Sequence, residues 1–118
     1  MEIVIISDSI SLNTVKDMAS KQFGDVIKAT VDVDKKIMAL GGDLHADEEQ
    51  LLLENDSKQN DLWGINLYPA KFGTPDFIEF DSMINLRPNQ GNMSRSVEDK
   101  STQEQIIAVV NALVVKDK

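Results

Sequence analysis

One stretch decides the fold: residues 26–42, VIKATVDVDKKIMALGG. From 26 to 33, apolar residues alternate with polar ones, which is the two-residue period of a β-strand with one face in water. Asp34 and Lys35 then form a tight connection, and the apolar run 37–41 predicts a second strand that lies inside the sheet. An antiparallel hairpin is therefore the expected centre of the fold.

The flanking sequence adds three strands and three helices. The strands are predicted over residues 3–6, 62–68 and 77–87. The first of these is apolar throughout, which predicts a central strand covered on both faces. The helices are predicted over 12–22 with Ser11 as the N-cap, over 48–54 behind the capping pair Asp47 and Gln50, and from the capping box Ser101 and Glu104 onward. A strand through Leu51–Leu53 remains an open alternative to the second helix.

The resulting element order is βαββαββα, in a single domain that spans residues 1–118. This order predicts an α+β fold, with a mostly antiparallel sheet of about five strands and helices packed on one face. Its first six elements follow the order of a ferredoxin-like split βαβ unit.

Composition and charge narrow the class of partner. The formal net charge is −8, and residues 43–61 hold seven acids against one lysine. Such a surface repels a phosphate backbone and no basic stripe offsets it, so we expect no nucleic-acid partner. No apolar run approaches the ~18 residues of a membrane span, so we expect no membrane partner. With no cysteine and no basic leader, the chain is expected to be a soluble cytoplasmic protein.

Alternation divides the predicted strand 77–87 into an apolar face and a polar face. The polar face carries Glu79, Asp81, Asn85 and Arg87. If strand 62–68 is the hairpin partner, Asn66 joins the same face. This ladder is either a solvated sheet face with ordinary ion pairs or one wall of a binding site.

The two arginines suggest the binding site. The chain has ten lysines but only Arg87 and Arg95, and these flank the loop 88–94. A guanidinium grips carboxylate or phosphate through two hydrogen bonds, and amide side chains can complete an anion pocket. The amides of that loop are Asn89, Gln90 and Asn92. The alternative is that both arginines pair with nearby acids and only fix the loop.

His45, the only histidine, lies among acids in the stretch 41–49. A histidine next to carboxylates can act in acid–base catalysis, with Glu79 or Asp81 as a second group, or can bind a divalent metal with Asp47 and Glu48. The spacing matches no zinc or calcium motif, so a metal site needs ligands from distant parts of the chain.

Three segments carry a resemblance: GDLHAD at 42–47, DLWGINLYP at 61–69 and INLRPNQGN at 84–92. They resemble a family of small prokaryotic proteins that is described only as a domain of unknown function. The resemblance implies a free-standing prokaryotic domain and implies no activity, cofactor or catalytic residue.

Three functions are compatible with these patterns. The first is a domain that binds a small molecule or anion, with Arg87 and Arg95 holding an acidic group. The second is a homo-oligomeric interaction module, such as a homodimer, that uses the open sheet face or a strand edge. The third is a metal-dependent hydrolase that uses His45 and carboxylates.

Overall fold

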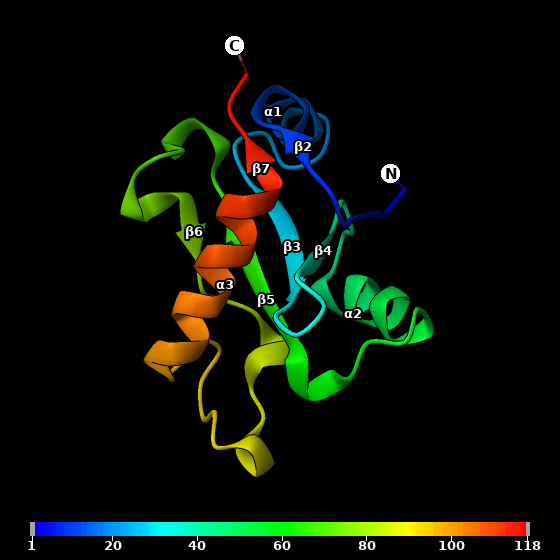
Figure 1. Cartoon of the computed structure of the whole chain (residues 1–118), viewed down its shortest axis with the longest axis vertical. Coiled ribbons are helices and arrows are strands. Elements are labelled where there is room, and N and C mark those ends of the chain that lie inside the picture. Colours follow the sequence, from blue (N-terminus) through cyan, green and yellow to red (C-terminus); the bar gives the residue numbers. More distant parts are fainter. Residues whose placement is uncertain (1, 118) are drawn as a thin grey trace.

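The computed structural model describes residues 2–117 and contains three α-helices and seven strands (Figure 1). The helices are α1 (Leu12–Ser20), α2 (His45–Glu54) and α3 (Lys100–Leu113). The strands are β1 (Val4–Ile6), β2 (Ile10–Ser11), β3 (Ile27–Asp32), β4 (Ile37–Leu40), β5 (Leu62–Leu67), β6 (Ile78–Glu79) and β7 (Val114–Val115). Among residues 2–117, no helix has both the length and the apolarity that a membrane crossing requires.

Five strands form one antiparallel sheet in the order β1-β4-β3-β5-β6. The predicted hairpin is its centre, since β3 pairs with β4 on one side and with β5 on the other. Strands β2 and β7 form a separate parallel pair, which places residues 10–11 beside residues 114–115 (Figure 1). The predicted α+β class and the mostly antiparallel sheet are confirmed.

The chain follows the ferredoxin-like arrangement for only part of its length. β1, α1 and β3 form a split βαβ unit, because β1 and β3 are parallel and β4 lies between them. β5 then lies beside β3 instead of returning to the β1 edge. The connection from β4 through α2 to β5 therefore moves toward the same edge of the sheet as the connection from β1 through α1 to β3. The two starting strands, β4 and β1, are antiparallel. Right-handed connections then require α1 and α2 on opposite faces.

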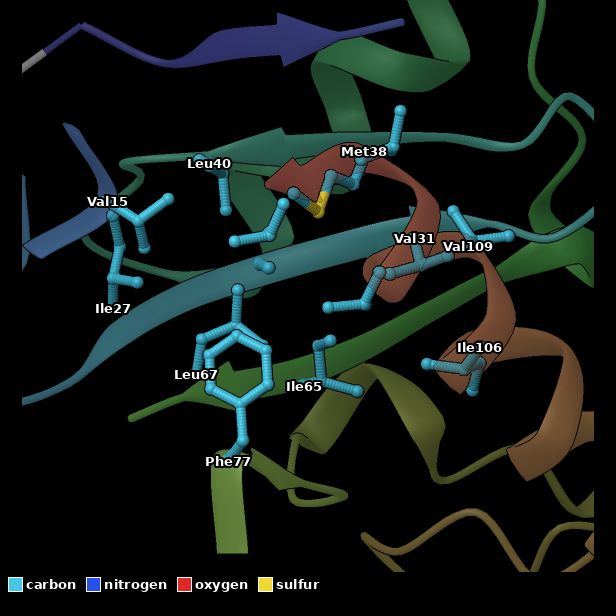
Figure 2. Close-up of a cluster of buried hydrophobic side chains, with 14 of the residues drawn as sticks. Val15, Ile27, Val31, Met38, Leu40, Ile65, Leu67, Phe77, Ile106 and Val109 are labelled. Carbon is cyan, nitrogen blue, oxygen red and sulfur yellow. The ribbon is translucent and has the colours of Figure 1, made fainter. Parts of the chain in front are cut away.

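The helices accordingly divide between the two faces, which differs from the predicted packing on one face. α1 and α3 cover the side of the sheet that carries Ile27, Ala29 and Val31 of β3, and this side holds the main apolar core (Figure 2). α2 covers the other side, where Leu52 packs on Ala39 and Leu62. Ile3, Ile5 and Ile37 extend this smaller cluster, and the polar part of the second side, on β3 and β5, contains most of the predicted site residues.

Two predictions about exposure are wrong. β1 is an edge strand, because it pairs only with β4 and has no neighbour on its other side. Val4 is accordingly exposed. The polar face of β3 is mostly enclosed, because α2 packs against it and only Lys28 stays half-exposed. Thr30 and Asp32 are buried, and the Asp32 carboxylate accepts hydrogen bonds from the amides of residues 34 and 35 and from the Ser57 hydroxyl.

The predicted strand 77–87 is also wrong, because the strand ends after two residues. β6 pairs only with Asn66 and Leu67 of β5, and the chain then leaves the sheet and forms a 3₁₀ turn over Met83–Asn85. The free edge of β5 is completed by a side chain instead, as described below. Glu79, Asp81, Asn85 and Arg87 consequently do not form a ladder.

The helix predictions hold with shifted bounds: α1 ends at Ser20 instead of residue 22, α2 begins at His45 instead of residue 48, and α3 begins at Lys100. Leu51–Leu53 is helical, which settles the alternative left open above, and α2 begins at His45 without a side-chain cap. The caps are confirmed at Ser11, which accepts the amide of Thr14, but not at Ser101. Asp99 caps α3 by accepting the amide of Thr102.

Candidate functional site

Asn85 closes the free edge of β5. Its Oδ1 accepts the amide of Gly64 at 2.8 Å, and its Nδ2 donates to the carbonyl of Gly64 at 2.9 Å and to that of Arg95 at 3.0 Å. One amide side chain thus makes the two hydrogen bonds that a neighbouring strand residue would make. Because Asn85 is fully buried and its amide is saturated, it is a structural residue and cannot orient a ligand.

Arg87 is also a structural residue, in contrast to its predicted role. Its Nη1 donates to the carbonyl of Gln59, and its Nη2 donates to that of Leu62 at 2.7 Å. The guanidinium lies over the ring of Trp63, with its central carbon 4.2 Å from the ring centroid. Burial lowers the pKa of Arg87. Both terminal nitrogens donate to carbonyls, and Nε, which has no partner within residues 2–117, is itself buried, so the group cannot grip an external anion.

The loop amides mostly hold the loop itself. Asn92 is buried, donates to the carbonyls of Asn85, Ser94 and Ser96, and accepts the amide of Glu98. Gln90 donates to the carbonyl of Asn60 at 2.9 Å. Asn89 is exposed, and its side chain makes no hydrogen bond within residues 2–117. A hollow of about 390 Å³ does border Gln90, Gly91 and Asn92, but Glu98 and Asp99 also line it, and neither arginine does.

Arg95 behaves differently from Arg87. Its Nε donates to Oδ1 of Asp81 at 2.6 Å, and the two side chains are 54% and 45% exposed. Neither terminal nitrogen of Arg95 has a hydrogen-bond partner among the described residues. The carboxylate thus fixes the guanidinium from one side, and the side that presents two parallel N–H groups remains open.

Asn66 lies next to this pair and has an unfilled acceptor. Its Nδ2 donates to Oε1 of Glu79 at 2.9 Å and to the carbonyl of Asp81 at 3.3 Å. Its Oδ1 is buried and meets no donor within residues 2–117. Tyr68 also donates to Oε1 of Glu79, at 3.2 Å. The tyrosine and the glutamate continue into a hollow of about 310 Å³ lined by Tyr68, Lys71, Pro75, Asp76, Ile78 and Glu79.

His45 stands behind these groups as a neutral base. Its Nε2 is 2.7 Å from the carbonyl of Ile65, so Nε2 carries the proton and Nδ1 keeps a lone pair. Burial lowers the pKa of His45, and the positive charges of Lys28 and Arg95 act in the same direction. The hydrogen bond to Ile65 and the charge of Asp81 oppose this shift but do not overcome it.

Glu48 lies deeper and is protonated at neutral pH. Burial raises its pKa to about 9. Its Oε1 is 3.0 Å from the hydroxyl of Thr30, and its Oε2 accepts the amide of Gly42 at 2.9 Å. A protonated Oε1 can donate to Thr30, whose hydroxyl then points to the carbonyl of His45 at 3.5 Å. Glu48 therefore supports α2 and the histidine and does not face solvent.

The predicted metal ligands do not converge. His45 is committed to a carbonyl through Nε2, Glu48 is enclosed, and Asp47 is exposed on α2. Within the described chain, no group of three or more His, Asp or Glu side chains is arranged to hold a metal ion.

Five predicted residues, His45, Asn66, Glu79, Asp81 and Arg95, form together with Lys28 what we call the open polar cluster. Lys28 was missing from the predicted binding set, although it lies directly opposite Asn66 in the register of β3 and β5. The strand alternation places both side chains on the same face and could have found it. The cluster combines an open guanidinium, an unfilled amide oxygen, a neutral imidazole and two carboxylates.

Comparison with known proteins gives a family and no activity. A family model described as a protein of unknown function (DUF5674) matches residues 4–113. No curated protein and no solved structure matches the chain.

Proposed function

Because the chain belongs to this family of unknown function, DUF5674, we propose its function from the site alone: it binds a small polar molecule with a carboxylate or phosphate group at the open polar cluster. The observation that carries the proposal is the unused hydrogen-bonding capacity of Arg95. Its two terminal nitrogens stay free while its Nε is fixed by Asp81. A guanidinium held in this way presents the fork that carboxylate and phosphate accept.

The neighbouring groups suit the rest of such a ligand. Lys28 adds a second positive charge on the same face. Glu79 is exposed, and its carboxylate can accept a hydrogen bond from a hydroxyl or an amine of the same ligand. An anionic group bound by Arg95, together with a donor group bound by Glu79, would occupy the exposed part of the cluster, while the buried Asn66 and His45 support it from below. Arg87 takes no part in this proposal.

The test is ligand-dependent thermal stability. Inorganic phosphate and citrate serve as probes, with sodium chloride at matched ionic strength as the reference. We expect either probe to raise the melting temperature of the natural chain, because a ligand that binds only the folded state stabilises it. Arg95→Lys should abolish that rise, since an ammonium cannot reproduce the fork.

Lys16→Gln is the matched control, because Lys16 is an exposed cation on α1, on the opposite side of the sheet. This variant should keep the full response to phosphate and citrate. Equal stabilisation of Arg95→Lys and the natural chain would refute the proposal, and so would the absence of any response to either probe in the natural chain.

A further inference from the structure

The segment 82–93 buries polar side chains and exposes large apolar ones. Its polar side chains are buried: Ser82 is 1% exposed, Asn85 0%, Arg87 8% and Asn92 4%. Its large apolar side chains face solvent: Met83 is 61% exposed, Leu86 42% and Met93 64%. Single exposed apolar residues are common, but an exposed apolar group combined with a buried polar set is the informative exception.

The exposure of these residues is not the result of a loose loop. The buried side chains fix the segment to β5 and to the turn before it, through the contacts of Asn85 with Gly64 and of Arg87 with Gln59 and Leu62. Asn92 closes the segment on itself. The polar contacts therefore determine which side chains point outward, and the apolar residues are held in place.

The three apolar residues are neighbours. The amide of Leu86 donates to the carbonyl of Met83 at 3.2 Å within the 3₁₀ turn. Arg87 and Asn92 form an antiparallel bridge with backbone hydrogen bonds of 2.9 and 3.1 Å. Leu86 and Met93 flank this bridge on opposite strands and, by alternation, point away from the buried pair. We call Met83, Leu86 and Met93 the apolar tip; the segment lies at one end of the long axis of the molecule (Figure 1).

We propose that the apolar tip is a docking surface for a basic amphipathic segment of another protein. Methionine suits this role because its flexible thioether adapts to the shape of a partner. The charges around the tip favour a basic partner: Glu98 and Asp99 are exposed beside Gly91 and Asn92, and the charge of Arg95 is balanced by Asp81 although its terminal nitrogens stay open. A second copy of this chain would bring acid against acid at a net charge of −8, and an anionic lipid surface would be repelled in the same way.

The test uses a synthetic 14-residue amphipathic peptide of leucine and lysine as the probe, and a leucine and glutamate peptide as its charge-reversed control. The full chain is labelled with ¹³C at the methionine methyl groups. We expect the Met83 and Met93 methyl resonances to shift on titration with the lysine peptide, while that of Met38, which is fully buried on the other side of the sheet, stays unchanged. The glutamate peptide should bind at least tenfold more weakly.

A double variant checks the surface by affinity. Met83→Ser with Met93→Ser should weaken binding of the lysine peptide at least tenfold, and the weakening should persist in 0.5 M sodium chloride, where charge attraction alone is screened. Phe23→Ser with Val115→Ser, two exposed apolar residues elsewhere, should bind like the natural chain. Both methionines are exposed, so the melting temperature should change little.

Several outcomes would overturn the proposal. They are equal affinity of the Met83/Met93 variant and the natural chain, a Met38 shift as large as those of the tip, or binding of the glutamate peptide as tight as that of the lysine peptide. Sedimentation that shows self-association of the natural chain, lost in the double variant, would assign the tip to a second copy. Binding to phosphatidylglycerol vesicles, lost in the double variant, would assign it to a membrane.

Discussion

The two faces of the sheet use the same strands and solve burial in different ways. On the side of α1 and α3, the alternating residues of β3, β4 and β5 are apolar and are packed by two helices (Figure 2). On the side of α2, a small apolar cluster of Ala39, Leu52 and Leu62 lies next to Thr30, Gly64 and Asn66 of β3 and β5, which are buried under polar side chains from outside the sheet. The comparison teaches that the second face depends on the pairing of individual hydrogen bonds, whereas the first depends on filled volume.

Of the proposed substitutions, Asn85→Leu should lower the unfolding free energy most, because it removes hydrogen bonds on which the second face depends. The substitution leaves the buried amide and carbonyl of Gly64 without partners and removes one of the two hydrogen bonds of the Arg95 carbonyl, which keeps the amide of Ser82, so it should cost about 4 kcal/mol of unfolding free energy. Urea denaturation measures the loss. Ile65→Leu on the apolar face is the matched control and should cost less than about 1.5 kcal/mol. If the two substitutions cost the same, the contrast between the faces is not real.

Gly64→Ala probes how closely the outer segment approaches the sheet. A Cβ at this position would lie 2.6 Å from both Cβ and Oγ of Ser82 and 3.1 Å from Cδ2 of His45. We expect a destabilisation of about 3 kcal/mol in urea denaturation, because neither neighbour is the free end of a flexible side chain. In a Ser82→Gly background the same substitution should cost clearly less, and a double-mutant cycle without such coupling would contradict the described contact.

Glu48→Gln should stabilise the protein by an amount that grows as pH rises. The folded chain keeps the Glu48 proton up to about pH 9, while the unfolded chain, with the ordinary pKa of 4.5, releases it. The unfolding free energy contributed by this group therefore falls as pH rises between those values. Glutamine matches the protonated carboxyl in shape and does not titrate. It should add on the order of 2 kcal/mol at pH 7, more at pH 8, and nothing near pH 4.5.

Urea denaturation of both chains across this pH range isolates the effect, since the other titrating groups cancel in the difference. A constant difference from pH 4.5 to pH 9 would mean that Glu48 is ionised when folded. Glu54→Gln, at an exposed position of the same helix, is the control and should give only a small difference.

Local periodicity predicted the elements that carry their own pattern. The hairpin of β3 and β4, the strand β5 and the helices α1 and α3 follow from it. The prediction of a strand over 77–87 is wrong although the alternation is intact. The chain leaves the edge of β5, and the side chain of Asn85 makes the hydrogen bonds to Gly64 that a strand backbone would make. The prediction that α2 packs on the same face as the other helices is wrong, because that face depends on which edge of the sheet β5 joins. No local pattern encodes that choice.

The candidate site was predictable in composition but not in roles. Asn66, Glu79, Asp81 and Arg95 were predicted and do lie together, with His45 behind them. A sequence cannot distinguish an amide or a guanidinium that binds a ligand from one that binds a backbone carbonyl. Asn85, Arg87 and Asn92 belong to the second kind, and only their burial and partners reveal it.

Comparing Arg87→Lys with Arg95→Lys tests whether the polar face has an enclosed part and an open part. Among the substitutions expected to lower the stability, Arg87→Lys has the smallest expected loss. Lysine keeps one charge and at most part of the bonding to Gln59 and Leu62, and loses the planar stacking on Trp63, so we expect a loss of about 1 kcal/mol. Fluorescence of Trp63, the only tryptophan, should change with it. Arg95→Lys should leave both the stability and the fluorescence nearly unchanged, because its ion pair is exposed. If Arg95→Lys costs as much as Arg87→Lys, Arg95 is also a structural residue, and the open polar cluster loses the free fork on which its proposed ligand depends.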